Sequence, residues 1–323
     1  MRQQKSRYGF LFKKKLLLGY IFAVMSAVLA SLTHSLSKTV LEHHDPTQAI
    51  NPLVLAVLVY MVAGLFFTPL RKSNSPVRGM GGKNLVLLSM IGIAEVIAMI
   101  VSFFGITETT AVNASIFINA EIIFSISIAA ILFKERLRQN EVLPFGLILL
   151  GVVVLPVGYD FYQNGMVFTN LVMGDMLIIL GGFFFSISNI IAKYVSENID
   201  ARRITQISSF VAAGFGLLVI LNFNISFEVS LEQLPTIVAM GILDVGLATL
   251  LFIIALRTIG AIKTILIFST ATVFGMLFAN VLLGEPITIL NVTSIVSVFV
   301  GLYWLRNRFS EDEDTARPKI NSA

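Results

Sequence analysis

Ten apolar runs, each of about 20 residues, recur along this 323-residue chain and exclude most folds at once. A helix of about 20 residues crosses roughly 30 Å of hydrocarbon. The runs are continuous and do not alternate at every second residue, so they predict helices and not the strands of a membrane barrel. They are Leu16–Ser37, Pro52–Leu70, Asn84–Gly105, Asn113–Phe133, Val142–Gly158, Asp175–Tyr194, Ile204–Asn222, Leu234–Leu256, Ile259–Leu283 and Ile289–Leu305.

The composition agrees with a chain that lies mostly in lipid. Hydrophobic residues make up 56% of it and charged residues 13%, with a mean hydropathy of +0.87. Soluble domains carry about 25% charged residues. The chain has no cysteine, which removes disulfides and thiolate metal sites from consideration. We therefore expect an integral membrane protein.

Lysine and arginine are unevenly distributed over the connections between the runs. Of the 23 such residues, 20 lie at the two termini or in every second connection, and the other three are Lys38, Lys193 and Lys263, placed in runs or at their ends. Because cytoplasmic loops are enriched in these residues, both termini are predicted to be cytoplasmic in a plasma-membrane protein. Such a topology requires an even number of crossings. The net charge of +4 then reports orientation and gives no reason to expect a nucleic-acid partner.

Two blocks of the sequence recur in the second half of the chain. A shift of 155 residues aligns the first run with the sixth, and a shift of 150 residues aligns the fourth with the ninth. Single apolar matches mean little in this composition, whereas matched charges and glycines indicate duplication. Such pairs are Gly19/Gly174, Lys38/Lys193, Glu42/Glu197, Glu135/Glu285 and Gly151/Gly301.

Each repeat holds five runs, an odd number, so the second repeat enters the membrane from the opposite side. The predicted fold is thus an all-α integral membrane protein with ten transmembrane helices arranged as two inverted five-helix repeats. We assign residues 1–15 to a basic cytoplasmic N-terminus, 16–158 to the first repeat, 174–305 to the second and 306–323 to a cytoplasmic tail.

Each repeat has a lysine at the end of its first helix, the sequence LFKERL or LLGEPI at the end of its fourth, and a glycine sixteen residues after the glutamate. This combination resembles the EamA-type repeat of the drug/metabolite transporter superfamily, over residues 16–305. The resemblance implies a secondary carrier for small metabolites, with a site formed by helices one, three, four, six, eight and nine. The proline that such repeats usually carry fourteen residues before the glutamate is replaced by Glu121 in one repeat and Ala271 in the other.

Two acidic residues occupy matching places on the third and eighth helices. The sequences GIAEV and GILDV align Glu95 with Asp244 at a shift of 149 residues. An ionisable group at a helix centre costs at least about 2.5–3.5 kcal/mol, so each needs a partner or a water-filled cavity. We expect Glu95 and Asp244 to line the central pathway as ligands of substrate or protons. In the alternative, each bonds a Ser, Thr or Lys of a neighbouring helix and has only a structural role.

Glu121 differs from this pair because its counterpart, Ala271, is uncharged. An acid that symmetry does not explain suggests a role specific to this protein. Our hypothesis is that Glu121 takes up and releases the coupling proton of a carrier. Structural hydrogen bonding, or pairing with a basic residue, is the alternative.

Three further residues of the fourth and ninth helices are candidates for contact with substrate. Lys263 takes the place of Asn113 in the other repeat, and it could bind an anionic group, pair with an acid or extend to the membrane surface. Asn113 and Asn119 belong to a set of polar residues that either line a cavity or bridge helices.

Four charged residues near helix ends suggest a structural or gating role. Lys38 and Lys193 recur in both repeats, which predicts an ion pair or a carbonyl contact that closes each half. Glu135 and Glu285 are expected to cap helix ends, at the inner and the outer face respectively.

No sequence motif indicates a metal, a cofactor or a catalytic residue. The cluster EHHD, from Glu42 to Asp45, is interpreted as a solvated outer loop because adjacent ligands do not easily enclose one ion. Walker, HExxH, GxSxG and dinucleotide-binding patterns are missing from the sequence, which argues against an ATP-driven pump and the commoner hydrolases.

The resemblance therefore implies a secondary active transporter, expected to be a proton-coupled exporter or exchanger that works by alternating access. Its expected partners are the lipid bilayer, protons and a small organic metabolite such as an amino acid or a drug-like compound, exported or exchanged. A homodimer is left open. The alternatives are an uncoupled facilitator or exchanger and, less favoured, an intramembrane enzyme that uses the buried acids.

Overall fold

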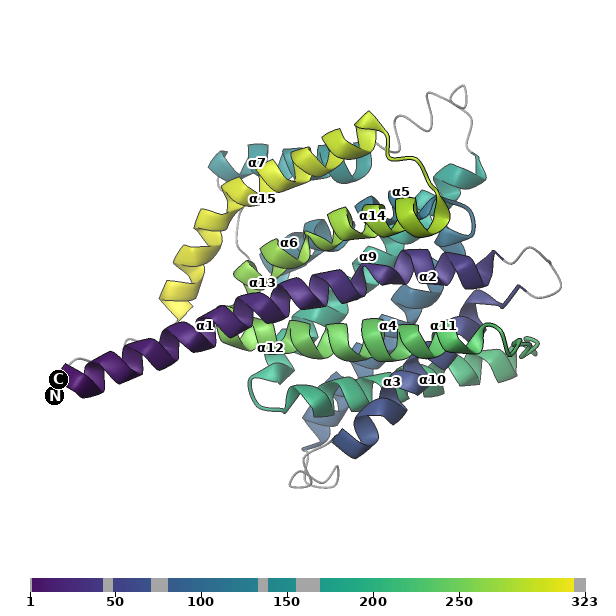
Figure 1. The fold of residues 1–323 in the computed structure, drawn as a ribbon, viewed down its shortest axis with the longest axis horizontal. Coiled ribbons are helices and arrows are strands. Elements are labelled where there is room, and N and C mark those ends of the chain that lie inside the picture. The colour runs from purple at the N-terminus through teal and green to yellow at the C-terminus, as the bar shows by residue number, and fades with distance from the viewer. Residues whose placement is uncertain (1, 43–48, 71–80, 133–138, 155–168, 317–323) are drawn as a thin grey trace.

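The computed structural model describes residues 2–42, 49–70, 81–132, 139–154 and 169–316, and all regular structure in these ranges is helical (Figure 1). In the first half of the chain the elements are α1 (Arg2–Ala30), α2 (Leu32–Leu41), α3 (Pro52–Leu70), α4 (Gly82–Ile106), α5 (Ala111–Phe117), α6 (Ala120–Leu132), α7 (Gln139–Leu149) and the π-helical η3 (Leu150–Val154). In the second half they are α9 (Asn170–Ser196), α10 (Ala201–Asn222), α11 (Leu234–Ala239), the π-helical η4 (Met240–Ala248), α12 (Thr249–Ile259), α13 (Ala261–Phe268), α14 (Ala271–Leu283) and α15 (Ile289–Ala316).

Seven helical stretches of the described residues are long and apolar enough to cross a membrane. Three shorter apolar helices, Ala111–Ser125, Val142–Val154 and Ile289–Trp304, lie at the places of the other three predicted spans. The all-helical membrane class is therefore confirmed. The count of ten crossings and the inverted relation of the repeats stay predictions.

The fourth and the ninth predicted spans are interrupted at corresponding points. The first passes from α5 to α6 at Ile118 and Asn119, and the second from α13 to α14 at Ser269 and Thr270, about 150 residues later. Serine and threonine side chains return hydrogen bonds to the preceding turn at the second break, as in Ser269 Oγ to the carbonyl of Leu266 at 2.8 Å. Such side chains compete with the helical ladder and favour an interruption.

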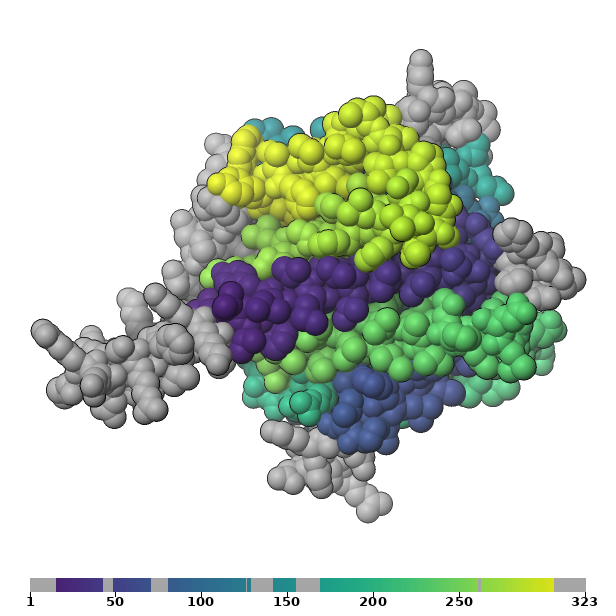
Figure 2. Space-filling model, in the orientation of Figure 1, coloured from purple at the N-terminus to yellow at the C-terminus, as the bar shows by residue number. Residues whose placement is uncertain are grey.

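The two halves are interlocked and do not lie side by side as separate bundles. Helix α1 packs against η4, α12, α13 and α14 of the second half, whereas α9 packs against α4, α5 and α6 of the first. Figure 2 shows this for α1 and α2, whose purple surface crosses the molecule between the green and yellow segments of the second half. The first helix of each half thus contacts the third and fourth spans of the other.

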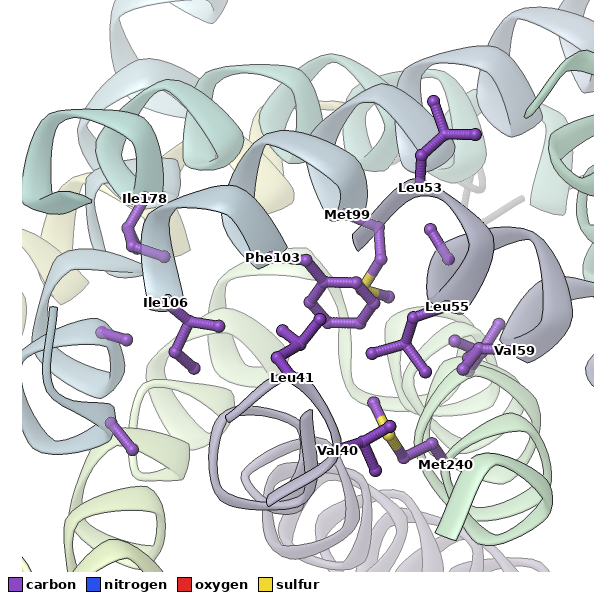
Figure 3. Close-up of a cluster of buried hydrophobic side chains, with 14 of the residues drawn as sticks. Val40, Leu41, Leu53, Leu55, Val59, Met99, Phe103, Ile106, Ile178 and Met240 are labelled. Carbon is purple, nitrogen blue, oxygen red and sulfur yellow. The ribbon is translucent and has the colours of Figure 1, made fainter. Parts of the chain in front are cut away.

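A buried apolar cluster joins α2, α3, α4, α9 and η4. Figure 3 shows Phe103 of α4 among Met99, Leu55 and Leu41, with Met240 of η4 below them. Phe103 is 2% exposed. This cluster holds together helices that come from both halves of the chain.

Glycine allows a close crossing of α4 and α9. A Cβ atom built on Gly105 would lie 2.7 Å from the carbonyl oxygen of Gly174, and one built on Gly174 would lie 2.7 Å from that of Gly105. Real Cβ atoms do not approach a backbone oxygen so closely. Both positions therefore need a residue without a side chain.

We predict that Gly174→Ala lowers the melting temperature of the detergent-solubilised protein, because the added methyl group forces the α4–α9 backbones apart at a cost of about 1–3 kcal/mol. Gly214→Ala is the matched control. A Cβ on Gly214 of α10 meets nothing within 4 Å, and alanine is the better helix former by up to about 1 kcal/mol. Equal melting temperatures for the two variants would contradict the packing described here.

Candidate functional site

A cavity of about 150 Å³ lies between the two halves of the chain. Its wall draws on the spans that contain α1 and α2, α4, α5 and α6, α9, η4 and α12, and α13 and α14, with one residue from α3. These are the helices whose packing interlocks the halves. Any movement of one half against the other would therefore change the shape of this cavity.

The three acids singled out in the sequence all line this cavity. Glu95 comes from α4, Glu121 from α6 and Asp244 from η4. Glu95 Oε1 accepts a hydrogen bond from Ser188 Oγ at 3.1 Å, and Glu121 Oε1 accepts one from Asn189 Nδ2 at 2.6 Å. Both donors lie on α9, so the acids of the first half are held by the second.

The backbone around Asp244 departs from the α-helix. Residues Met240–Ala248 form a π-helix, whereas the matching stretch around Glu95 is ordinary α-helix. Ser26 Oγ of α1 donates a hydrogen bond of 2.7 Å to the carbonyl of Ala248, where the π-helix ends. Short π-helical segments occur often at functional sites. The duplication has therefore kept an acid at both places but not the same backbone.

Asp244 also has an oxygen without a hydrogen-bond partner. Its side chain is buried and lies beside Thr33, yet Oδ2 finds no donor among the residues that the structure describes. An unpaired buried carboxylate oxygen is costly, and in a native protein it calls for an explanation. Because Asp244 lines the cavity, a water molecule, a ligand or a proton is the available partner.

No lysine or arginine appears among the described residues of the cavity wall, which holds His34 and Tyr60 as its other titratable side chains. Lys263 begins the Lys263–Leu283 span as an exposed residue and does not line the cavity. The structure therefore gives no support to pairing between Lys263 and the acids.

The two asparagines predicted for the site lie outside the cavity wall and bridge helices. Asn119 Nδ2 donates to Thr272 Oγ1 at 2.6 Å and to the carbonyl of Ile116 at 3.1 Å. Asn113 Oδ1 accepts from Asn291 Nδ2 at 3.3 Å. Both bonds to side chains join the two halves, and Asn119 does so where α5 and α6 are interrupted.

Lys38 and Glu285 meet at the far end of α2. Lys38 Nζ lies 3.4 Å from Glu285 Oε1 and 3.3 Å from Glu42 Oε1, and it donates to the carbonyl of Thr109 at 2.5 Å. The two Glu285 oxygens accept hydrogen bonds from the backbone N–H groups of Ala111 and Val112 at 2.9 and 2.8 Å. Glu285 thus caps the start of α5 in the other half of the chain.

The network continues to α9. Thr109 Oγ1 donates a hydrogen bond of 2.5 Å to Asp175 Oδ1, and Asp175 is fully buried. We refer to Lys38, Thr109, Asp175 and Glu285 as the end network. Its members lie on four separate elements or their connections, so it closes one end of the interface between the halves.

The structure describes only one of the two residues that correspond by symmetry to Lys38 and Glu285. Lys193 is exposed on α9. Glu135, its expected neighbour by symmetry, lies outside the described residues. The predicted role of this second pair stays a prediction.

Sequence reasoning missed three contributions to the cavity wall. Tyr60 comes from α3, a helix without polar clustering, and the π-helix around Asp244 has no recognisable sequence signal. Ser26 supports the end of that π-helix from a distance of 222 residues in sequence. The only sequence signal for Ser26 was its polar side chain in the middle of an apolar run.

The fold and the cavity define a multi-pass membrane protein with a chamber between two interlocked halves, lined by three acids and otherwise mostly by apolar side chains. The chain matches the EamA-like transporter family twice, over residues 17–156 and 172–307. It belongs to this family and is a membrane transporter.

Individual relatives agree with this assignment. The chain is 30% identical over 304 residues to a protein of Methanothermobacter thermautotrophicus named an uncharacterized transporter, covering 88% of this chain and 86% of that one. It is 23% identical to an uncharacterized transporter of Clostridium kluyveri, with 88% and 91% covered. A crystal structure with 18% identity and a TM-score of 0.60 covers 92% of this chain and 99% of its own, and it shows the shared fold.

We predict that Glu285→Ala destabilises the protein by about 1–3 kcal/mol, because it leaves two buried backbone donors of α5 without their acceptor and removes one of the two carboxylates bound to Lys38. Glu285→Gln keeps an acceptor and is expected to lose less. Thermal unfolding in detergent provides the measurement, with the exposed Glu228→Ala as control. A Glu285→Ala protein as stable as the control would show that the end network does not hold the halves together.

Proposed function

We propose that this transporter is a proton-coupled exporter or exchanger of a small organic metabolite, working by alternating access around the cavity. One observation carries the proposal: three acids from helices of both halves line a single chamber in the membrane-spanning part of the protein. Intramembrane acids of this kind mark substrate and proton pathways in transporters. Membership in a transporter family favours transport over intramembrane catalysis.

Proton coupling is assigned to Glu121. Its symmetry counterpart, Ala271, lines the same cavity without a charge, so one side of the chamber carries an acid that the other lacks. Asn189 donates a hydrogen bond to one Glu121 oxygen, which leaves the other for a proton. Taking up and releasing that proton would change the charge of the chamber at one position.

Alternating access is assigned to the interlocked halves and the end network. The Lys38–Glu285 pair closes one end of the interface, which is the outer end in the topology expected from the basic residues. In this proposal two inverted repeats lie in the plasma membrane with both termini in the cytoplasm. Breaking the end network would open the chamber to the outside.

We predict that Glu121→Gln abolishes the dependence of transport on a pH gradient, because glutamine keeps the hydrogen bond to Asn189 but exchanges no proton. Metabolites that differ between cells lacking and overproducing the protein supply the substrate. Its accumulation in proteoliposomes is then measured with and without an imposed pH gradient. The variant is expected to equilibrate substrate without concentrating it.

Glu228→Gln makes the same chemical change at an exposed residue and is expected to keep gradient-driven accumulation. If gradient-driven accumulation persists in Glu121→Gln, Glu121 does not carry the coupling proton. Wild-type protein that moves substrate only down its own gradient, whatever pH gradient is imposed, would identify an uncoupled facilitator instead.

A further inference from the structure

The cavity holds three acidic side chains and no basic residue of the described chain to compensate them when they are ionised. Glu95, Glu121 and Asp244 line it, and no lysine or arginine does so among the described residues. Lys38, on α2 beside the chamber, is bound to Glu285, Glu42 and Thr109. Arg257 of α12 is exposed. Carboxylates in a low-dielectric chamber are unfavourable without a counter-charge, so protons or a ligand must supply it.

We propose that the chamber selects a small organic monocation, an amine on an aromatic or aliphatic group, and that Asp244 binds the ammonium group. This rests on the proposed function, because it assigns the substrate class of the same site. The unpaired Oδ2 of Asp244 is the acceptor that such a group needs, and charge-assisted hydrogen bonds of this type are the strong ones. An anionic substrate would instead meet three acids.

The rest of the chamber suits an organic cation better than a metal ion. No group of three His, Asp or Glu side chains close enough to hold a metal occurs in the described part of the chain. The acids are therefore spread around the chamber. Five aromatic side chains line it as well, and aromatic faces attract cations: Tyr60, Phe103, Phe185, Phe252 and Phe268.

Size limits the substrate further. The chamber measures about 150 Å³, and an engineered apolar cavity of about that volume in another protein accepts benzene. A single ring with a short ammonium arm fits this limit. Larger amines would require the chamber to widen as the halves move.

Cation and protons then compete for the same acids. The titratable groups that face Asp244 across the chamber are Glu95, Glu121, His34 and Tyr60. An arriving ammonium ion favours the ionised form of the acids, so protons that they hold are released to solvent. This competition would couple export of the cation to entry of protons without a separate proton pathway.

The test uses three probes of nearly equal size that differ in charge: benzylammonium, benzyl alcohol and benzoate. Their binding to the purified full-length protein is measured by calorimetry in weakly buffered detergent, while a pH indicator records proton release. We expect benzylammonium to bind at least about tenfold more tightly than benzyl alcohol, and benzoate to bind most weakly. Proton release is expected with benzylammonium alone.

Asp244→Asn is the matching variant, because it keeps the shape of the side chain and removes its charge. It is expected to weaken benzylammonium binding at least about tenfold and to leave benzyl alcohol nearly unchanged. Glu228→Gln should bind all three probes as the wild type does. If Asp244→Asn does not fold, as judged by its thermal transition, Glu95→Gln is measured in its place. It is expected to weaken benzylammonium binding by a smaller factor and to leave benzyl alcohol binding nearly unchanged.

Equal affinity for the three probes, a preference for benzoate, or a folded wild-type protein that binds none of them would each overturn the proposal. These outcomes are separable from failure of the proposed function. Gradient-driven transport of a neutral or acidic metabolite without benzylammonium binding would support the proposed coupled carrier and refute its selectivity for cations. If benzylammonium binding depends on Asp244 but no transport is found, the cation site would be supported and the proposed coupled transport refuted.

Discussion

Charge inside a membrane-spanning protein must be compensated, and this structure concentrates the problem at the interface between its halves. The acids Glu95 and Glu121 of the first half accept hydrogen bonds from α9 of the second. Asp244 of the second half lies beside Thr33 of the first. Because each acid is held from the opposite half, relative motion of the halves and the state of the acids cannot be independent. That linkage is the physical argument for the coupling proposed above.

The end network also compensates charge across the interface between the halves, at one end of it. Glu285 binds Lys38 and caps α5, so one carboxylate satisfies a cation and two backbone donors at once. Such an arrangement ties the fourth span of the second half to the first and fourth spans of the first. In the chamber itself, by contrast, Asp244 Oδ2 has no hydrogen-bond donor among the residues that the structure describes.

Much of the fold could be predicted because hydropathy is a local property. Continuous apolar runs identified the helical membrane class, and matched charges identified the duplication. The acids stood out because they interrupt apolar runs, and all three line the chamber. Asn113, Asn119 and Lys263 lie on the fourth and ninth spans but away from the chamber. The sequence could not decide this, because the side that a residue faces depends on helix rotation and on the interruptions in α5–α6 and α13–α14. Tyr60 could not be inferred, since nothing around it in sequence is polar.

The sequence by itself determined that the chain is helical, lies in a membrane, is duplicated and carries acids within its spans, because each of these follows from residue type and spacing along one helix. Only the tertiary structure decided that three acids share one chamber, that the backbone at Asp244 is π-helical, and that Lys38 pairs with Glu285. These depend on contacts between residues far apart in sequence: Glu121 and Asn189 are separated by 68 positions, Glu95 and Ser188 by 93, and Lys38 and Glu285 by 247. Helix packing alone brings such residues together.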